Sequence, residues 1–331
     1  MSFVEFEQPL SKHFLVIDGS NLLYRMVYVD RSKNFKHPNR LLERLTGEQQ
    51  TSLNVDSPEF IRQAAIHGFF ESLNATKQKH GADDVIVCFD TGKSWRHKHT
   101  TSGTSLTKNV YKGNRRVDMT PKDEESFEIF KATAKEVIEI LDNHTGIKCI
   151  HQPSLEADDI IAGLTQFYKE HTYTIISADG DLTQLIADHV RVYDIHNKKY
   201  RECEDVNYFL FLKCIRGDKG DNVMSAFPRV RETKIKQAYT DDYHRVNLME
   251  TVWKDENDIE WKVGDVFKEN QLLMDLTKQP EEVRDLIKTT IDEKLLQSKF
   301  MRKFEIVKEL NTRGLPSVGD IVSSATWLCG T

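Results

Sequence analysis

The amino-acid sequence predicts an α/β protein with a mostly parallel central sheet flanked by helices, followed by a smaller helical C-terminal domain. Short apolar runs alternate with helical patterns over the first 200 residues, as in sheets built from strand-helix-strand units. Beyond residue 200 the strand pattern fades, and helical segments with turn-rich connections follow. With 331 residues, 39% of them hydrophobic, the chain is long enough to bury a substantial core.

The predicted strands are rich in valine and isoleucine, which favour a pleated, half-buried surface. They are HFLVI (13–17), VIVCF (85–89), IKCI (147–150), YTIIS (173–177) and VRVYD (190–194). Helical patterns separate several of these strands, at residues 59–80, at residues 121–143 and from Ser154 onward.

The loss of the strand pattern places a domain boundary at residue 200, between domains at residues 1–200 and 201–331. Residues 31–58 and 240–265 are interpreted as irregular insertions, because neither shows a clear period or an internal repeat. Their roles are not readable from the sequence.

The composition argues against a membrane protein and a secreted disulfide scaffold. No apolar run approaches membrane-spanning length, and the N-terminal stretch MSFVEFEQPLSKHF lacks the apolar core of a signal peptide. The five cysteines form no CxxC pair, and their odd number fits reduced thiols. We therefore expect a cytoplasmic protein with no structural zinc site.

A basic segment lies inside this acidic chain, whose formal net charge is −6. The segment between Thr91 and Val117, here the basic strip, has seven lysine and arginine residues and no acidic one. They are Lys93, Arg96, Lys98, Lys108, Lys112, Arg115 and Arg116. Such a strip is either a solvated loop or a phosphate-binding segment, and its acidic surroundings in the sequence favour the second.

Acidic residues directly follow three of the predicted strands. Asp18 follows HFLVI, Asp90 follows VIVCF, and Asp179 with Asp181 follows YTIIS. Ligands of parallel sheets bind beyond the carboxyl ends of the strands. One such aspartate often only caps a turn or a helix, but three strands that end alike indicate a common site.

Two further acidic groups complete a set of nine carboxylates. Glu156, Asp158 and Asp159 open the third predicted helix, where acids also complement the helix dipole. Asp218 and Asp221 lie in RGDKGDN, which could equally be a solvated loop. Nine carboxylates at one end of a sheet would repel one another without cations. Oxygen ligands fit Mg²⁺, with Mn²⁺ as a substitute, and suffice for two ions about 4 Å apart that drive phosphoryl displacement.

Six motifs follow one another in the order seen in 5′-nucleases. They are IDGSN (17–21), CFD (88–90), YKGNR (111–115), LEADD (155–159), SADGD (177–181) and GDKGDN (217–222). On these motifs the chain resembles the flap endonucleases and bacterial polymerase-associated 5′-3′ exonucleases, and among them the ribonucleases H of T-even bacteriophages. The resemblance implies a PIN-like core and a catalytic domain at residues 1–200, with the basic strip as an arch.

The resemblance also implies a role for each acid. The first metal ion would be surrounded by Asp18, Asp90, Glu156, Asp158 and Asp159. The second would be held by Asp179, Asp181, Asp218 and Asp221. Lys112 and Arg115 would donate to the scissile or 5′-terminal phosphate, and would act as catalytic residues together with Asp179 and Asp181.

Nucleic acid would contact the rest of the basic strip and a duplex-binding, helix-turn-helix-like region in the C-terminal domain. The strip would supply Lys93, Arg96, Lys98, Lys108 and Arg116, and the C-terminal region Arg229, Arg231, Lys234 and Lys236. Tyr111 would stack on an unpaired base or be a core aromatic. The paired glycines of the family's duplex-binding hairpin are missing after GDKGDN, so no cation site is expected in that hairpin.

The implied function is a Mg²⁺-dependent 5′-3′ exonuclease and flap endonuclease with RNase H activity, which removes RNA primers and 5′ flaps in DNA replication. Its substrates would be branched or flapped DNA and RNA:DNA hybrids with a free 5′ end. Its partners would be a single-strand-binding protein and polymerase accessory proteins. We expect a monomer without membrane contacts, in the host cytoplasm if the chain is viral.

Two other functions stay open, a PIN-domain single-strand ribonuclease and a non-catalytic module that binds branched DNA. A PIN-domain enzyme would be shorter and would lack YKGNR and GDKGDN. A haloacid-dehalogenase phosphatase is disfavoured, because Ser20 stands where its nucleophile motif needs a second acid. Metal-dependent cleavage of a 5′-flap substrate separates these functions.

Overall fold

The computed structural model describes residues 11–28, 56–117, 119–297 and 299–330. The predicted insertion at residues 31–58 lies almost entirely outside these ranges. Six strands form one sheet in the order β3-β2-β1-β4-β5-β6, and all neighbours are parallel except β5 and β6. The strands are β1 (His13–Asp18), β2 (Asp84–Phe89), β3 (Lys148–His151), β4 (Thr172–Ile176), β5 (Val190–Asp194) and β6 (Lys199–Tyr200). The predicted α/β class with a mostly parallel sheet is confirmed.

The strand order reverses at β1, which pairs with β2 on one side and β4 on the other. The chain adds β2 and β3 outward from β1, then crosses over and adds β4 and β5 on the opposite side. Adjacent connections leave the sheet on opposite faces at such a point, so a crevice opens beyond the carboxyl ends of the two strands. The carboxyl ends of β1 and β4 are therefore where the fold favours a ligand.

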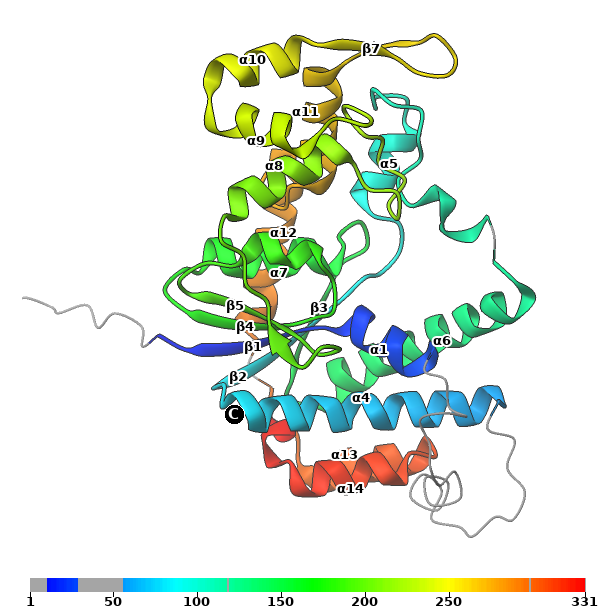
Figure 1. Ribbon diagram of the computed structural model, residues 1–331. Coiled ribbons are helices and arrows are strands. Elements are labelled where there is room, and N and C mark those ends of the chain that lie inside the picture. The colour runs from blue at the N-terminus through cyan, green and yellow to red at the C-terminus, as the bar shows by residue number, and fades with distance from the viewer. Residues whose placement is uncertain (1–10, 29–55, 118, 298, 331) are drawn as a thin grey trace, which may run out of the picture.

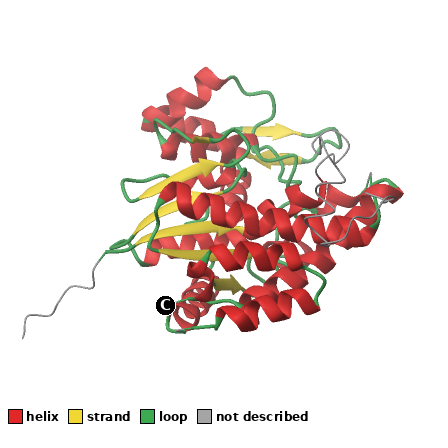
Figure 2. Ribbon diagram, turned by 90° about the horizontal axis from the view of Figure 1, so that it is seen from below, coloured by secondary structure: helices red, strands yellow, loops and turns green. Residues whose placement is uncertain are grey.

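Two apolar layers enclose the sheet, because successive side chains of a strand point to opposite faces. In β1, Leu15 and Ile17 enter one layer while Phe14 and Val16 enter the other. The first layer contains side chains of α1 (Gly19–Tyr28), α4 (Pro58–His80), α6 (Pro121–His144), α13 (Lys303–Thr312) and α14 (Pro316–Ser324). The second contains side chains of α7 (Ala157–Phe167) and α12 (Glu281–Leu295). Figure 2 shows the strands enclosed between helices.

Local signals set the ends of the two longest helices. Ser57 caps α4 by accepting from the Phe60 N–H, and Gly81 ends it in the left-handed conformation. Thr120 and Asp123 form a capping box that starts α6 directly after the basic strip. The two helices begin and end within one residue of the predicted ranges.

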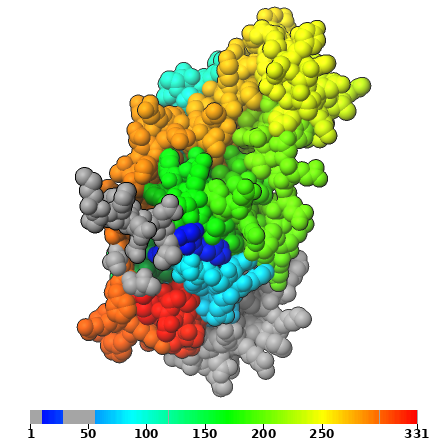
Figure 3. Space-filling view, turned by 90° about the vertical axis from the view of Figure 1, so that its left-hand side faces the viewer, coloured from blue at the N-terminus to red at the C-terminus, as the bar shows by residue number. Residues whose placement is uncertain are grey.

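A separate lobe follows the sheet and stands above it in Figures 1 and 3. Its core is built around Ile215, Ile235, Leu248 and Val263. The lobe contains α8 (Val206–Arg216), α9 (Glu232–Thr240), α10 (Asp242–Glu250), β7 (Val252–Lys254), β8 (Glu260–Lys262) and α11 (Val263–Met274). Residues 240–265 are thus not irregular as predicted. The sequence does not reveal α10 because only Leu248 of this helix is buried, and one buried residue gives no apolar period.

The chain returns to the sheet after this lobe. In α12, Ile287 and Ile291 pack into the layer of α7, while Ile306 and Leu310 of α13 pack into the layer of α4. Residues 281–330 therefore belong by packing to the sheet domain, and the predicted division at residue 200 stays a prediction. Within the described ranges, no helix has both the length and the apolar character to cross a membrane.

Candidate active site

Three strand ends and one helix start deliver the acids of the predicted site. Asp18 is the last residue of β1, Asp90 follows β2, and Asp179 lies shortly after β4. Asp158 comes from the first turn of α7. The charges of Asp90 and Asp179 lie close enough to raise the pKa of both Asp18 and Asp158. We call Asp18, Asp90, Asp158 and Asp179 the four-aspartate centre. The structure thus brings these predicted residues together at the strand-order reversal.

Hydrogen bonds fix the carboxylates of this centre. Asp18 accepts from the Asn21 N–H at 3.0 Å and from the Ser177 hydroxyl at 2.8 Å. Asp90 accepts from the Ala157 N–H, and Asp179 accepts from the N–H of Asp181, each at 2.8 Å. For Asp90 and Asp179 these bonds use only one oxygen. No further hydrogen bond to either carboxylate is found among the described residues.

The four-aspartate centre carries negative charge that the protein itself does not balance. Burial and the neighbouring charge of Asp90 raise the pKa of Asp18 to about 7. Burial and the charge of Asp179 raise the pKa of Asp158 well above its usual value. Among the described residues, no lysine, arginine or histidine makes an ion pair with any of the four. Clustered carboxylates that lack a basic partner fit the oxygen ligands of a divalent cation.

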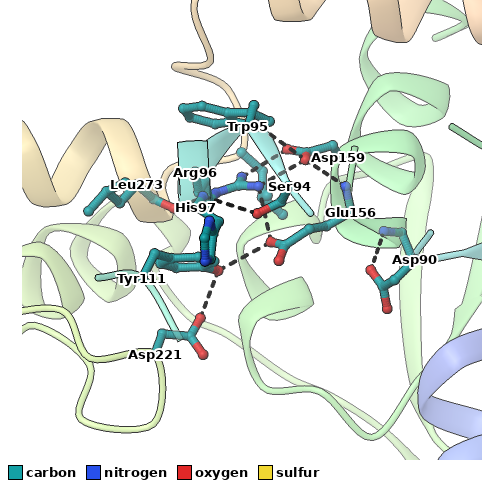
Figure 4. A network of polar contacts seen from close by, with 12 residues as sticks. Asp90, Ser94, Trp95, Arg96, His97, Tyr111, Glu156, Asp159, Asp221 and Leu273 are labelled. Carbon is teal, nitrogen blue, oxygen red and sulfur yellow. Dashed lines mark hydrogen bonds and ion pairs between the residues drawn. The ribbon is translucent and has the colours of Figure 1, made fainter. Parts of the chain in front are cut away.

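The other five predicted ligands differ, because each has a basic partner inside the protein. Arg96 contacts Glu156 at 3.1 Å and Asp159 at 2.8 Å (Figure 4). Glu156 also contacts Lys112 at 2.6 Å. Asp221 contacts Arg115 at 2.6 Å, and both Asp181 and Asp218 contact Lys213. The nine carboxylates therefore divide into four without a cationic partner and five with one.

Asp159 is surrounded by donors and is fully buried, which corrects its prediction as a metal ligand. Arg96 binds both of its oxygens, and Trp95 and Gln279 donate to it as well. Burial by itself would raise the pKa of Asp159, but Arg96 lowers it below the usual value. No oxygen is left for an ion. The shared helical face of Glu156 and Asp159 turns toward Arg96, while Asp158 joins the four-aspartate centre.

Arg96 is 1% exposed, so it cannot contact a nucleic acid strand on the surface as predicted. Its Nε donates to the Leu273 carbonyl at 2.7 Å, and its guanidinium lies over the Trp95 ring. The side chain thus joins the start of α5 (Trp95–Thr101) to α7 and to the end of α11. The sequence reasoning missed this role. The tryptophan beside Arg96 was the available signal of burial.

Replacing Arg96 with Ala is expected to lower the free energy of unfolding by about 3–5 kcal/mol, because Asp159 keeps a buried charge without a partner. Urea denaturation without metal measures this loss. Arg191→Ala changes an exposed arginine of β5 and should leave the midpoint in place. The double replacement of Arg96 and Asp159 by Met should recover stability. An Arg96→Ala midpoint equal to wild type would contradict the pairing.

Tyr111 is also buried, which corrects the prediction that it stacks on a base and supports the alternative of a core aromatic. It is 5% exposed and belongs to a small apolar cluster with Cys214, Val223 and Leu273. Its hydroxyl lies 2.8 Å from a carboxylate oxygen of Asp221 and 3.2 Å from one of Glu156, and its single proton can be donated to either. Tyr111 therefore links two of the paired carboxylates below Lys112.

The remaining predicted nucleic-acid contacts lie on the surface, apart from the half-buried Lys112. The exposed ones are Lys93, Lys98, Lys108, Arg115, Arg116, Arg229, Arg231, Lys234 and Lys236. Arg116 lies in η1 (Gly113–Arg116) over the Phe127 ring, and Lys234 lies over the Phe227 ring. Their binding of phosphates stays a prediction.

A second group of ligand atoms lies around β3. Among the described residues, Asp142, Cys149 and His151 form a group whose ligand atoms all lie within 4.8 Å of one another. Lys294 contacts Asp142 at 2.7 Å, and Lys299 also lies beside it. These two ammonium groups supply the cation that Asp142 needs, which argues against a metal ion there.

The affinity of the protein for Mg²⁺ is expected to rise with pH through about 7, because protons and the ion compete for Asp18. In the absence of metal, the stability of the folded protein should instead fall as pH rises. The folded protein binds this proton more tightly than the unfolded chain, whose pKa is 3.8, so this contribution to stability is lost as pH rises through about 7. Melting temperatures in EDTA and in Mg²⁺, measured between about pH 5 and pH 9, test both signs. A pH-independent shift by Mg²⁺ would contradict the assignment of Asp18.

A comparison with protein families identifies the family of this chain. The family model described as the 5′-3′ exonuclease N-terminal resolvase-like domain matches residues 13–209, which contain every residue of the four-aspartate centre. This chain belongs to the 5′-3′ exonuclease family. DNA polymerase I of Streptococcus pneumoniae is 29% identical over 245 residues, which are 68% of this chain and 23% of the polymerase. The chain thus spans less than a quarter of that relative's length.

Two other relatives are closer in length to this member of the 5′-3′ exonuclease family. The 5′-3′ exonuclease of Mycoplasmopsis pulmonis is 27% identical over 226 residues, covering 64% of this chain and 61% of that protein. The flap endonuclease of Escherichia phage T5 is 24% identical over 237 residues, covering 66% of this chain and 67% of that protein.

Solved structures of the phage T5 D15 flap endonuclease share the fold. A pseudo-enzyme-product complex with DNA and metal ions has a TM-score of 0.60 and 18% identity, and covers 86% of this chain and all of that one. A T5 5′-exonuclease with bound zinc has a TM-score of 0.58 and 19% identity, with the same coverage. The sheet, the flanking helices and the lobe of this chain are therefore an arrangement shared with a known 5′-exonuclease.

Proposed function

We propose that this chain is a Mg²⁺-dependent 5′-nuclease that hydrolyses phosphodiester bonds as a 5′-3′ exonuclease and flap endonuclease. The observation that carries the proposal is the four-aspartate centre, whose negative charge lies close enough to Lys112 to interact with it. The family and the names of the T5 relatives support flapped DNA as substrate. Mn²⁺ is expected to substitute for Mg²⁺.

The aspartates would bind and orient the metal centre in this proposal. Asp18, Asp90 and Asp158 would hold a first ion. Asp179, which the resemblance assigned to the second ion, would join the first because its charge acts on Asp18 and Asp158. Asp181 with Asp218 would hold the second ion. Bound divalent ions activate a water molecule and stabilise the leaving 3′ oxygen. Glu156 and Asp221 would act indirectly, because they position Lys112 and Arg115.

Lys112 and Arg115 would donate to the phosphate on which charge develops during cleavage. Burial alone would lower the pKa of Lys112, but Glu156 and Asp221 raise it above its usual value. Lys112 is therefore a cation and not a base at neutral pH. To bind a phosphate, Lys112 would leave Glu156 and Arg115 would leave Asp221. Each side chain would then replace one charge-assisted hydrogen bond to a carboxylate with one to the phosphate.

The biological role is the finer part of the proposal. We propose that the enzyme cleaves RNA:DNA hybrids as well as DNA, and that it removes RNA primers and 5′ flaps during replication in the cytoplasm. It would act as a monomer beside a single-strand-binding protein and polymerase accessory proteins. Product lengths on matched flap, nicked and RNA-primed substrates distinguish exonuclease, flap and RNase H activity.

A free 5′ end is expected to be required, because the basic strip would admit a single strand and exclude a bulky block. Streptavidin bound to a 5′-biotinylated flap before the enzyme is added should suppress cleavage. Streptavidin added after the complex forms should leave cleavage largely intact. Gel analysis of the cleaved flap measures both arms.

The substrate controls separate the alternatives. Equal cleavage of flaps blocked beforehand, or of closed circular single strands, would show a general endonuclease and contradict the requirement for an end. Preference for single-stranded RNA would indicate a PIN-type ribonuclease. Retention of an intact flap in Mg²⁺ would indicate a binding module.

A further inference from the structure

Lys213 lies where α8 meets the acids of the second predicted ion, and none of the sequence motifs contains it. Its side chain is 12% exposed and makes ion pairs with Asp181 and with Asp218, the latter at 3.3 Å. The helix ends one turn later, where the Gly217 N–H donates to the Lys213 carbonyl at 2.8 Å. The backbone of Lys213 is thus fixed beside the two carboxylates.

The two carboxylates reach Lys213 from different elements. Asp181 is the first residue of η2 (Asp181–Leu185), and Asp218 lies in the turn after α8. Asp218 accepts from the Gly220 and Asp221 N–H groups with Oδ1, and turns Oδ2 toward Lys213. One ammonium group therefore neutralises the oxygens that a second metal ion would need.

The ammonium group of Lys213 lies between two carboxylates, in contact with Asp181 and 3.3 Å from Asp218. A divalent ion bound between the same carboxylates would lie within a few ångströms of this positive charge and would be repelled. Among the described residues, no lysine or arginine makes an ion pair with a carboxylate of the four-aspartate centre.

We propose that Lys213 holds the place of the second divalent ion and sets its affinity, so that the enzyme binds a first ion tightly and a second weakly. The proposal rests on the proposed metal-dependent nuclease function. Lys213 is a positioning residue in this scheme, because it acts through Asp181 and Asp218. The second ion binds only when the ammonium group moves off these carboxylates.

Counting bound Mn²⁺ by electron paramagnetic resonance tests this without any cleavage. The full-length chain should bind one ion tightly and one weakly. In Lys213→Met the second ion should bind about tenfold more tightly or better, because the competing charge is gone. Lys213→Arg keeps the charge and should behave like wild type. Lys219→Met removes an exposed lysine beside Asp218 and should also behave like wild type.

A double variant, Lys213→Met with Asp181→Asn, tests whether the tighter second ion binds at Asp181. This variant should no longer bind the second ion more tightly than wild type. Thermal melting in EDTA confirms that each variant is folded. Second-ion affinity in Lys213→Met that equals or falls below wild type would overturn the role of Lys213, even when the first ion binds and flaps are cleaved. A wild-type protein that binds no Mn²⁺ and cleaves no flap would overturn the proposed function as well.

Discussion

Replacement of Asp158 by Asn should reduce cleavage of a 5′-flap by about a thousandfold or more, because the first ion loses a charged ligand. Binding of the duplex should stay within a few-fold of wild type, since phosphate contacts are spread over the basic surface. Single-turnover rates in Mg²⁺ and a binding titration in EDTA measure the two quantities. The same outcome is expected for Asp18→Asn and Asp179→Asn.

The same replacement should stabilise the protein when metal is absent. Asp158 has a raised pKa because it is buried beside the charge of Asp179, so removing its charge relieves repulsion. The melting temperature in EDTA should therefore rise, while the stabilisation by Mg²⁺ should shrink. This pairing of lost activity with gained stability is typical of residues that serve a site at a cost to the fold.

Asp188→Asn provides the matched control, because Asp188 is an exposed aspartate between η2 and β5. It should change neither cleavage nor melting. Full turnover by Asp158→Asn in Mg²⁺ would remove this residue from the metal centre. A lower melting temperature in EDTA would show that its charge is balanced in the folded protein.

Lys112→Ala should lower the single-turnover rate by about 100-fold to 1,000-fold, which is the usual loss of one donor to developing charge. Arg115→Ala should act in the same direction. In the structure Lys112 contacts Glu156 and Arg115 contacts Asp221, each at 2.6 Å, and we expect both side chains to turn toward a bound phosphate. Binding of the first ion should be nearly unchanged, since these residues contact none of its proposed ligands.

Lys108→Ala is the control for charge alone, because Lys108 is an exposed lysine of the same strip. Its loss should weaken binding modestly and reduce the salt dependence, since one fewer counterion is released. Its single-turnover rate should stay close to wild type. Equal rates for wild type and Lys112→Ala at saturating enzyme would make the strip an electrostatic surface without a catalytic donor.

The sequence of the basic strip does not reveal which of its basic side chains are buried. Seven positive residues without an acid predict a surface that binds phosphates, and most of them are exposed. Arg96 has the same charge and the same local composition, yet it lies inside the protein. Composition cannot separate the two cases, because burial of an arginine depends on whether distant carboxylates arrive beside it.

The sequence by itself determined the sheet, the positions of the acids at its strand ends and the family. Runs such as HFLVI and VIVCF specify strands through their own side chains, and the motifs are contiguous in the chain. These features depend on local preference and on order along the chain, and both are readable without coordinates.

Only the tertiary structure decided which of the nine acids have a basic partner inside the protein. Arg96 meets Asp159 across 63 residues, and Arg115 meets Asp221 across 106. Lys213 reaches Asp181 only because α8 packs against η2. A carboxylate near an ammonium or guanidinium group is neutralised, while one beside other carboxylates needs an external cation. Because these charges come from distant parts of the chain, the division of the nine acids follows from the packing of helices against the sheet.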